Sequence, residues 1–322
     1  MRYVLIGSGN IANTYLAALK RVPGSRLVGC VSRSGRLPSA ASGLECRSRL
    51  SEIGQAFDAV IVATPNGLHH EGVLEAARLG KHVLTEKPLD INREAMAQMI
   101  AACDAAGCML AVAYQHRTDP DSQAIKQLLR EGRLGRIYAA DLSCKFWRDQ
   151  AYYDSAAYRG GWAIDGGGPF MQQACHNIDL YQWFFGMPDE VSARMATFAH
   201  RMEAEDHGAA LLHYANGMIG TIVASTCARP GLPARLEVVC DKGVFVTLDD
   251  RIARWDIDGV ANPTRGREVP QAAANVATLS DAEPHAAILR DFEAAIVEGR
   301  APLADARSAA QTTELILRIY GR

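Results

Sequence analysis

The sequence lacks long hydrophobic runs, a surplus of charge of one sign and closely spaced cysteine pairs. No apolar stretch approaches the ~18 residues of a membrane-spanning helix, so we expect no membrane association. The 34 basic and 36 acidic residues leave a formal net charge of −2, which produces no field that would attract nucleic acid. A strand-like run begins directly after Met1 and leaves no room for a signal peptide, so the cytoplasm is the expected location.

The eight cysteines are dispersed along the chain, and no two of them form a Cys-x-x-Cys pair. A disulfide framework or a zinc site is therefore not expected. The adjacent His69 and His70 also suit metal binding on a helix poorly, so we predict no metal. We interpret the cysteines as small buried hydrophobic residues of a protein in a reducing compartment.

The composition that remains is that of an ordinary globular protein, at a length that favours two domains. Of the 322 residues, 48% are hydrophobic and 22% are charged. Single hydrophobic cores usually stop growing at roughly 250–300 residues. No internal repeat or low-complexity segment interrupts the chain. We predict a first domain over residues 1–118 and a second over residues 119–322.

The first domain opens with an apolar strand, a glycine turn and a helix. The turn carries the pattern G-x-G-x-x-A at residues 7–12. Gly7 permits a tight turn, Gly9 removes a side chain where a pyrophosphate must approach, and Ala12 lets the helix pack on the strand. The N-terminus of the helix then offers unpaired N–H groups to phosphate. The predicted dinucleotide contacts here are Gly7, Gly9, Asn10 and Ile11.

The end of the second strand bears on the choice of cofactor. About 20 residues after the glycines, an NAD site usually places a carboxylate on the ribose 2′-hydroxyl. That position holds Ser32 and Arg33, and a hydroxyl and a guanidinium suit the 2′-phosphate of NADP. We therefore prefer NADP to NAD. The alternative is that Arg33 stacks over adenine while NAD binds.

Strands and helices continue to alternate up to residue 113, which predicts a doubly wound parallel sheet, the Rossmann fold. One buried strand ends at residues 64–66 and the next at Glu86-Lys87-Pro88. Ligands collect at the carboxyl ends of such strands. Pro88 favours an extended backbone at Lys87, so we expect a cation on a stiff support beside a crevice. The alternative is a surface turn with a solvated lysine.

The second half has the pattern of an α+β domain. Apolar residues alternate over residues 138–146, and Asn216-Gly217 between two further strands is a hairpin signal. These and later strands predict a largely antiparallel sheet. Two helices, near residues 283–299 and 306–320, close the chain.

A glycine loop at residues 166–168 precedes a predicted helix over residues 170–185. Pro169 suits the first turn of a helix. Gln172, His176 and Asp179 are spaced four and three apart, so they share one face of this helix. A polar face behind a glycine loop fits the wall of an active site, whereas the alternative is a solvated polar stripe.

Taken together, these motifs resemble the Gfo/Idh/MocA family of oxidoreductases. The resemblance rests on the glycine pattern, on A-T-P-N at 63–66, on E-K-P at 86–88 and on Q-A-x-H-x-x-D at 173–179, and it covers nearly the whole chain. It implies an open-faced sheet that mediates homodimer or homotetramer contacts. It also implies a dinucleotide cleft with the nicotinamide near Glu86 and Lys87. The full set of expected cofactor residues is Gly7, Gly9, Asn10, Ile11, Ser32, Arg33, Thr64, Pro65, Asn66, His69, Glu86, Lys87 and Gln115.

The resemblance implies hydride transfer between NAD(P) and a secondary alcohol or ketone of a sugar, sugar acid, nucleotide sugar or cyclic polyol, and so a place in carbohydrate metabolism. His176 matches the general acid/base, and imidazole titrates near neutral pH. Lys87 is expected to stabilise charge on the substrate oxygen. Gln172 departs from the Asp or Asn common in relatives, which leaves open what controls the protonation of His176. The other expected substrate contacts are Gln172, Asp179, Arg159, Trp162 and Tyr153.

Two alternatives remain at this stage. One is a sensor or regulator that binds NAD(P) on the same fold but has lost its chemistry. The other is an enzyme that never releases its cofactor and recycles it with a second substrate.

Overall fold

The computed structural model describes residues 1–33, 35, 37–38, 41, 43–269 and 282–322. The chain divides into two compact units by its internal contacts. Unit 1 comprises Met1–Gln115 and Thr278–Ala310, and unit 2 comprises His116–Ala277 and Gln311–Arg322. The domain limits at residues 118 and 119 stay a prediction, because this division reflects contacts and not independent folding.

Unit 1 is built on a six-stranded sheet in the order β3-β2-β1-β4-β5-β6. Every pair of neighbouring strands is parallel, which confirms the predicted doubly wound sheet. The order reverses between β1 and β4, where ligands bind in folds of this kind. The strands are β1 (Arg2–Ile6), β2 (Arg26–Val31), β3 (Glu45–Arg47), β4 (Ala59–Val62), β5 (His82–Thr85) and β6 (Leu110–Val112).

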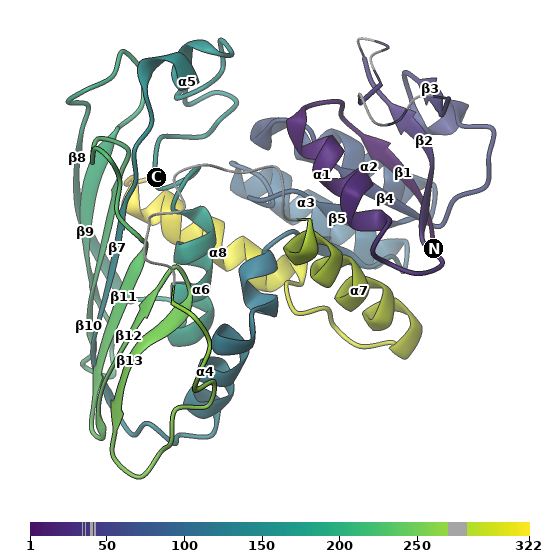
Figure 1. The fold of residues 1–322 in the computed structure, drawn as a ribbon. Coiled ribbons are helices and arrows are strands. Elements are labelled where there is room, and N and C mark those ends of the chain that lie inside the picture. The colour runs from purple at the N-terminus through teal and green to yellow at the C-terminus, as the bar shows by residue number, and fades with distance from the viewer. Residues whose placement is uncertain (34, 36, 39–40, 42, 270–281) are drawn as a thin grey trace. The chain divides into compact units, whose positions relative to one another are not determined.

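Helices pack on the sheet of unit 1, with α1 (Asn10–Leu19) beside α7 (Glu283–Glu298) and α2 (His69–Arg78) beside α3 (Arg93–Ala105) (Figure 1). Because both faces are covered, the central strands read as continuous apolar runs, and all four residues of β4 are fully buried. Three short 3₁₀ helices complete the local structure: η1 (Leu50–Glu52), η2 (Asn66–Leu68) and η3 (Gln115–Thr118).

Unit 2 is built on a seven-stranded sheet in the order β13-β12-β11-β7-β10-β9-β8. Only β7 and β10 pair in parallel, so the predicted largely antiparallel sheet is confirmed. The strands are β7 (Ile137–Lys145), β8 (Glu190–Ala196), β9 (His207–His213), β10 (Ile219–Ser225), β11 (Arg235–Cys240), β12 (Gly243–Leu248) and β13 (Arg251–Ile257).

Helices lie on one face of this sheet. Figure 1 shows α4 (Pro120–Arg130) and α6 (Cys175–Phe185) on that face, and no described helix covers the other. A short helix, α5 (Gln150–Asp154), follows β7, and α8 (Ala306–Ile319) begins in unit 1 and ends in unit 2. Helix α6 begins five residues later than predicted, because residues 169–174 form turns.

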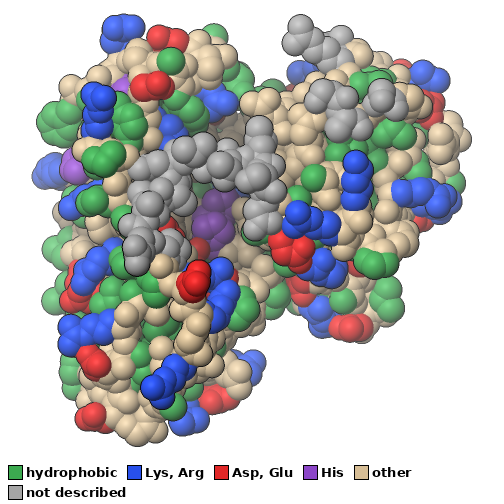
Figure 2. All heavy atoms as spheres, in the orientation of Figure 1, with side chains coloured by type: hydrophobic (Ala, Val, Ile, Leu, Met, Phe, Trp, Pro, Cys, Tyr) green, Lys and Arg blue, Asp and Glu red, His purple; other side chains and the backbone are tan. Residues whose placement is uncertain are grey.

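The distribution of charged, apolar and cysteine side chains in the structure can be compared with the composition of the sequence. Figure 2 shows acidic and basic side chains interspersed over the face drawn. Within the described ranges, no helix combines the length and apolar character that crossing a membrane requires. All eight cysteines are described and free of disulfides, five of them buried and three partly buried.

Candidate active site

The glycine turn follows β1 at the point where the strand order of unit 1 reverses. Gly7 has a φ of +111°, and a Cβ there would lie 2.7 Å from the carbonyl carbon of Ala63, so no other residue fits without backbone movement. A Cβ at Gly9 would meet no described atom within 4 Å. Gly9 therefore leaves open space in front of α1, where Asn10 and Ile11 present the first N–H groups of the helix.

A cleft of about 910 Å³ opens beside this turn within unit 1. Five of the predicted cofactor residues line it: Gly7, Ser32, Arg33, Thr64 and Pro65. The cleft also contains polar residues that the sequence analysis missed, namely Ser48, Arg49, Ser51 and Arg78. Ser48 and Arg49 lie between β3 and η1, Ser51 lies in η1 and Arg78 ends α2. No local motif marks these residues. Three arginines therefore border a cleft of the kind that a dinucleotide needs.

The other predicted cofactor residues of this unit do not line this cleft. Asn66 opens η2 and Gln115 opens η3. His69 is fully buried, with Nδ1 at 2.8 Å from the carbonyl oxygen of Pro88 and Nε2 at 3.0 Å from that of Thr64. Burial lowers the pKa of His69. The ring links the turn after β4 to the turn after β5, so its contacts are those of a structural support.

Glu86 is held by two aromatic side chains from other elements. The Tyr15 hydroxyl donates to Oε1 at 2.7 Å, and His285 Nε2 of α7 lies 3.7 Å from the same oxygen. Burial alone raises the pKa of Glu86, but the His285 and Tyr15 contacts outweigh it and leave the pKa below its usual value. The charged carboxylate also accepts from the Lys87 N–H at 3.2 Å. Lys87 is partly buried and joined to Pro88 by a cis peptide bond.

In unit 2, helix α6 is anchored by a buried ion pair. Asp179 is fully buried and accepts from Arg117 Nε at 2.8 Å, Arg117 Nη2 at 2.6 Å and Thr312 Oγ1 at 2.8 Å. Such two-pronged geometry fixes both partners. The Arg117 guanidinium also lies 5.4 Å from the ring of Trp183. The predicted contact of Asp179 with substrate or with His176 stays a prediction.

His176 is the second residue of α6 and is partly buried. Its ring stacks on that of His116, with centroids 4.5 Å apart and planes inclined by 8°. His116 Nδ1 in turn lies 2.5 Å from Asp250 Oδ2. Burial lowers the pKa of His116, but Asp250 raises it more, and the net result is a pKa above the usual value. Neither His116 nor Asp250 belongs to a motif, so no sequence pattern marks either residue.

The glycine loop before α6 is ordered by Glu205. Its carboxylate accepts from the backbone N–H of Gly168 at 3.0 Å and of Phe170 at 3.4 Å, and from the Tyr320 hydroxyl at 2.8 Å. Burial raises the pKa of Glu205 to about 6. Gln172 lies in the turn that follows, where its Nε2 donates to the Asp165 carbonyl at 2.9 Å.

The predicted substrate residues before the loop make contacts within unit 2. The Tyr153 hydroxyl lies 2.7 Å from Thr226 Oγ1, and the side chain is 5% exposed. The Arg159 guanidinium lies 4.5 Å from the ring of Tyr152. Trp162 packs edge-on against Tyr320 with centroids 5.0 Å apart. Their roles toward substrate stay predictions.

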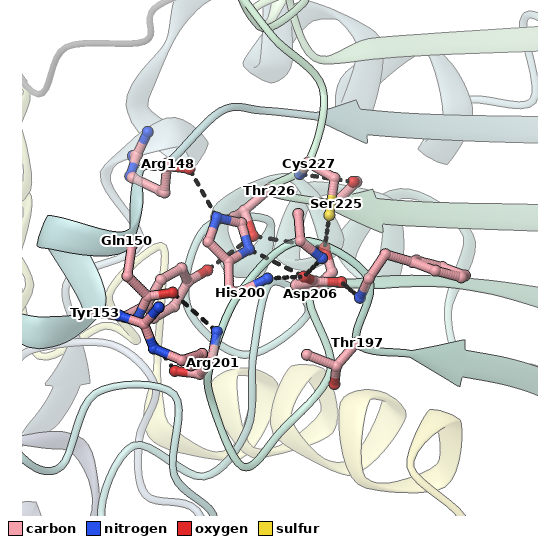
Figure 3. Close-up of polar contacts among 12 residues, drawn as sticks. Arg148, Gln150, Tyr153, Thr197, His200, Arg201, Asp206, Ser225, Thr226 and Cys227 are labelled. Atoms are coloured by element: carbon pink, nitrogen blue, oxygen red, sulfur yellow. Dashed lines mark hydrogen bonds and ion pairs between the residues drawn. The ribbon is translucent and has the colours of Figure 1, made fainter.

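One cluster in the described chain, His200, Asp206 and Cys227, brings potential metal ligands within 4.8 Å of one another (Figure 3). The Asp206 carboxylate already accepts the N–H groups of residues 198, 199 and 200, and His200 Nδ1 lies 3.0 Å from it. His200 Nε2 lies 2.9 Å from the Arg148 carbonyl. A metal ion would have to displace these bonds, so we interpret the cluster as a loop-ordering network.

Each of the two units matches a known protein family model. A family model described as "Oxidoreductase family, NAD-binding Rossmann fold" matches residues 1–114, and one described as "GFO/IDH/MocA C-terminal domain" matches residues 122–246. The chain is 31% identical to the WlbA dehydrogenase from Bordetella pertussis, solved in complex with NADH and UDP-GlcNAcA. The match covers 99% of this chain and 95% of that one, with a TM-score of 0.87.

Two curated enzymes are also similar. Inositol 2-dehydrogenase from Rhizobium meliloti (strain 1021) is 25% identical over 275 residues, which is 82% of this chain and 81% of that protein. The NADP(+) scyllo-inositol 2-dehydrogenase IolW from Bacillus subtilis (strain 168) is 28% identical over 219 residues, 67% of this chain and 57% of that protein. The matches and the two sheets confirm the predicted resemblance: the chain belongs to the Gfo/Idh/MocA family and is an oxidoreductase that uses NAD or NADP.

Proposed function

We propose that this oxidoreductase acts on a secondary alcohol or ketone of a sugar, sugar acid, nucleotide sugar or cyclic polyol. The observation that carries the proposal is an imidazole, His176, at the start of α6, in a chain whose unit 1 holds a dinucleotide cleft. The bound nicotinamide supplies or accepts the hydride. His176 takes the hydroxyl proton in the oxidative direction, and the Lys87 ammonium stabilises negative charge on the same oxygen.

The residues of the cleft fit a nicotinamide dinucleotide. The space at Gly9 and the N-terminus of α1 suit a pyrophosphate, and Ser32 and Arg33 follow β2, where the adenosine ribose binds in this fold. We favour NADP, because Arg33, Arg49 and Arg78 border this end of the cleft. Glu71 pairs with Arg33, so a 2′-phosphate would compete with Glu71 for the guanidinium.

The similar proteins suggest which classes of substrate to test first. The WlbA structure contains a nucleotide sugar acid, and two curated relatives are named for inositols. Nucleotide sugar acids therefore come first in a screen and cyclic polyols second, each with NAD and with NADP. We keep the cytoplasm as the proposed location, because the dispersed cysteines fit a reducing compartment.

The His176→Ala variant tests the proposed role of the imidazole. Loss of a general acid/base should lower kcat by about 100- to 10,000-fold. Cofactor affinity, measured by isothermal titration calorimetry, should stay near that of the wild type. Near-normal turnover in this variant would reject the role. A protein that binds NAD(P) but oxidises or reduces no member of the screen would instead support the catalytically silent sensor.

A further inference from the structure

The stacked pair His116 and His176 connects η3 to α6. The rings are nearly parallel, 8° apart in plane and 4.5 Å apart in centroid, so one face of His176 is covered by another imidazole. Stacked neutral aromatic rings attract each other. If one ring carries a proton, however, a second proton on the other is disfavoured by repulsion between like charges.

The structure specifies which ring carries that proton. His116 Nδ1 lies 2.5 Å from Asp250 Oδ2, an ion pair in a partly buried setting. Burial lowers the pKa of His116, yet the charge and hydrogen bond of Asp250, with weaker help from Asp179 and Asp249, raise it above the usual value. The carboxylate of Asp250 therefore favours the protonated form of His116.

The position of Asp250 is built into a tight turn. Asp249 and Asp250 join β12 to β13 with φ values of 43° and 65°, a conformation that side-chain-bearing residues rarely adopt. Asp249 Oδ1 accepts from the Ala234 N–H at 2.8 Å, which ties the turn to β11. Asn177 Nδ2, from α6, lies 3.3 Å from Asp250 Oδ1. The carboxylate is thus held between its own turn and the helix that bears His176.

Two polar side chains near His176 in the sequence, Asp179 and Gln172, are bound by other groups. Asp179 lies one turn further along α6, but Arg117 and Thr312 saturate its carboxylate. Gln172 carries no charge and donates to Asp165. His116 faces the His176 ring directly, and its protonated form is the one that Asp250 favours.

We propose that Asp250 and His116 form a positioning pair that keeps His176 neutral, and so able to accept a proton, at neutral pH. An uncharged Gln172 cannot control the protonation of His176 through its own charge, whereas this pair can. This inference rests on the proposed function of His176 and adds the group that controls it. The pair touches neither substrate nor cofactor in this scheme and acts through the His176 ring.

The test is the pH profile of kcat/KM in the oxidative direction, with the full chain. The acid limb marks protonation of His176. In Asp250→Asn, His116 loses its counter-ion and its proton, so the limb should move to higher pH, by about one unit. His116→Phe keeps an aromatic ring against His176 but removes the group that can carry a positive charge. The acid limb of this variant should therefore move to higher pH by at least as much as that of Asp250→Asn.

Asp258→Asn is the control, because it removes an exposed carboxylate that follows β13 and is not among the charges that shift the pKa of His116, so its acid limb should stay at the wild-type pH. Titration of the His176 ring by NMR in ¹³C-histidine-labelled protein gives a second readout, independent of turnover. In Asp250→Asn and His116→Phe, the pKa of His176 obtained from this titration should rise together with the pH of the acid limb.

The outcomes separate the two claims. An unchanged acid limb and an unchanged His176 titration in both variants would overturn the inference, while an inactive His176→Ala variant leaves the proposed function standing. Near-normal turnover in His176→Ala would instead reject the proposed function. The NMR titration still decides whether the pair controls the ring.

Discussion

At the scale of single residues, the cleft of unit 1 is notable for its guanidinium groups. Arg33, Arg49 and Arg78 come from three different segments and border one opening. A guanidinium is always charged and presents paired donors that match phosphate oxygens. The 2′-phosphate is the only group that distinguishes NADP from NAD, so a change at one arginine should separate the two cofactors.

The Arg33→Gln variant should raise the KM for NADP by about 10- to 100-fold, which is the effect of one charge-assisted hydrogen bond. The KM for NAD should change much less, because NAD has no phosphate there. Steady-state kinetics with both cofactors gives the two values.

The control for this experiment is Arg47→Gln, at the end of β3. Arg47 is exposed and does not line the cleft, so its loss should leave both KM values unchanged. Equal changes for NADP and NAD in Arg33→Gln would contradict a 2′-phosphate contact and favour stacking of Arg33 on adenine.

At the scale of elements, the turns before α6 depend on a carboxylate from the segment between β8 and β9. Glu205 is 4% exposed, and it accepts from the N–H groups of Gly168 and Phe170. These donors precede α6, which begins at Cys175. Glu205 therefore orders the segment that leads into the helix bearing His176.

Glu205 also makes stability depend on pH. Burial raises its pKa to about 6 from an ordinary value of 4.5. A raised pKa of an acid in the folded state means that the contribution of Glu205 to stability is complete below pH 4.5 and is lost as the pH rises through 6. The loss corresponds to about 2 kcal/mol in the free energy of unfolding. Glu205→Gln cannot ionise, so the stability of the wild type relative to this variant should fall by that amount.

Urea unfolding at pH 4.5 and pH 7 measures this difference. All four tryptophans, Trp147, Trp162, Trp183 and Trp255, lie in unit 2, so their fluorescence reports on the unit that contains Glu205. Glu203→Gln removes an exposed carboxylate two residues away and should show no comparable change. A difference between the wild type and Glu205→Gln that is the same at both pH values would contradict the assignment.

At the scale of the whole molecule, the sheet of unit 2 has one face that no described helix covers and on which apolar side chains are exposed. Leu211 of β9 is 52% exposed and Ile219 of β10 is 51% exposed, whereas their neighbour Leu212 is fully buried on the helix side. Exposed apolar side chains grouped on one face are typical of association surfaces. We propose that this face mediates a homodimer or homotetramer.

The Leu211→Glu/Ile219→Lys double variant should lower the molar mass in light scattering after gel filtration, because burying two charges opposes association. Circular dichroism should stay unchanged, since neither side chain belongs to the core. Val297→Glu, at an 84% exposed site on α7, is the control and should keep the wild-type mass. An unchanged mass in the double variant would show that association, if any, uses another surface.

The parts of the fold and the site that could be predicted are those with a local cause. The turn at Gly7, the alternating strands of unit 1 and the antiparallel strands of unit 2 each follow from residues adjacent in the chain. The predicted start of α6 at Phe170 was wrong, because the segment before Cys175 forms turns, and its contact with Glu205, 35 positions from Phe170, has no local signal in the sequence. Ser32 and Arg33, which line the cleft, were predicted as cofactor contacts from their distance to the glycines, whereas Arg49 and Arg78 carried no comparable signal.

The sequence by itself determined the order of the elements, the glycine turn and the histidine of α6, since hydrophobic period and backbone sterics act over a few residues. Only the tertiary structure decided the neighbours of the charged groups: His285 beside Glu86, Arg117 on Asp179, and Asp250 beneath His116. Each of these contacts joins residues that are 62 to 199 positions apart. Their energy depends on burial and on distance in space, and neither quantity is a property of a short stretch of chain.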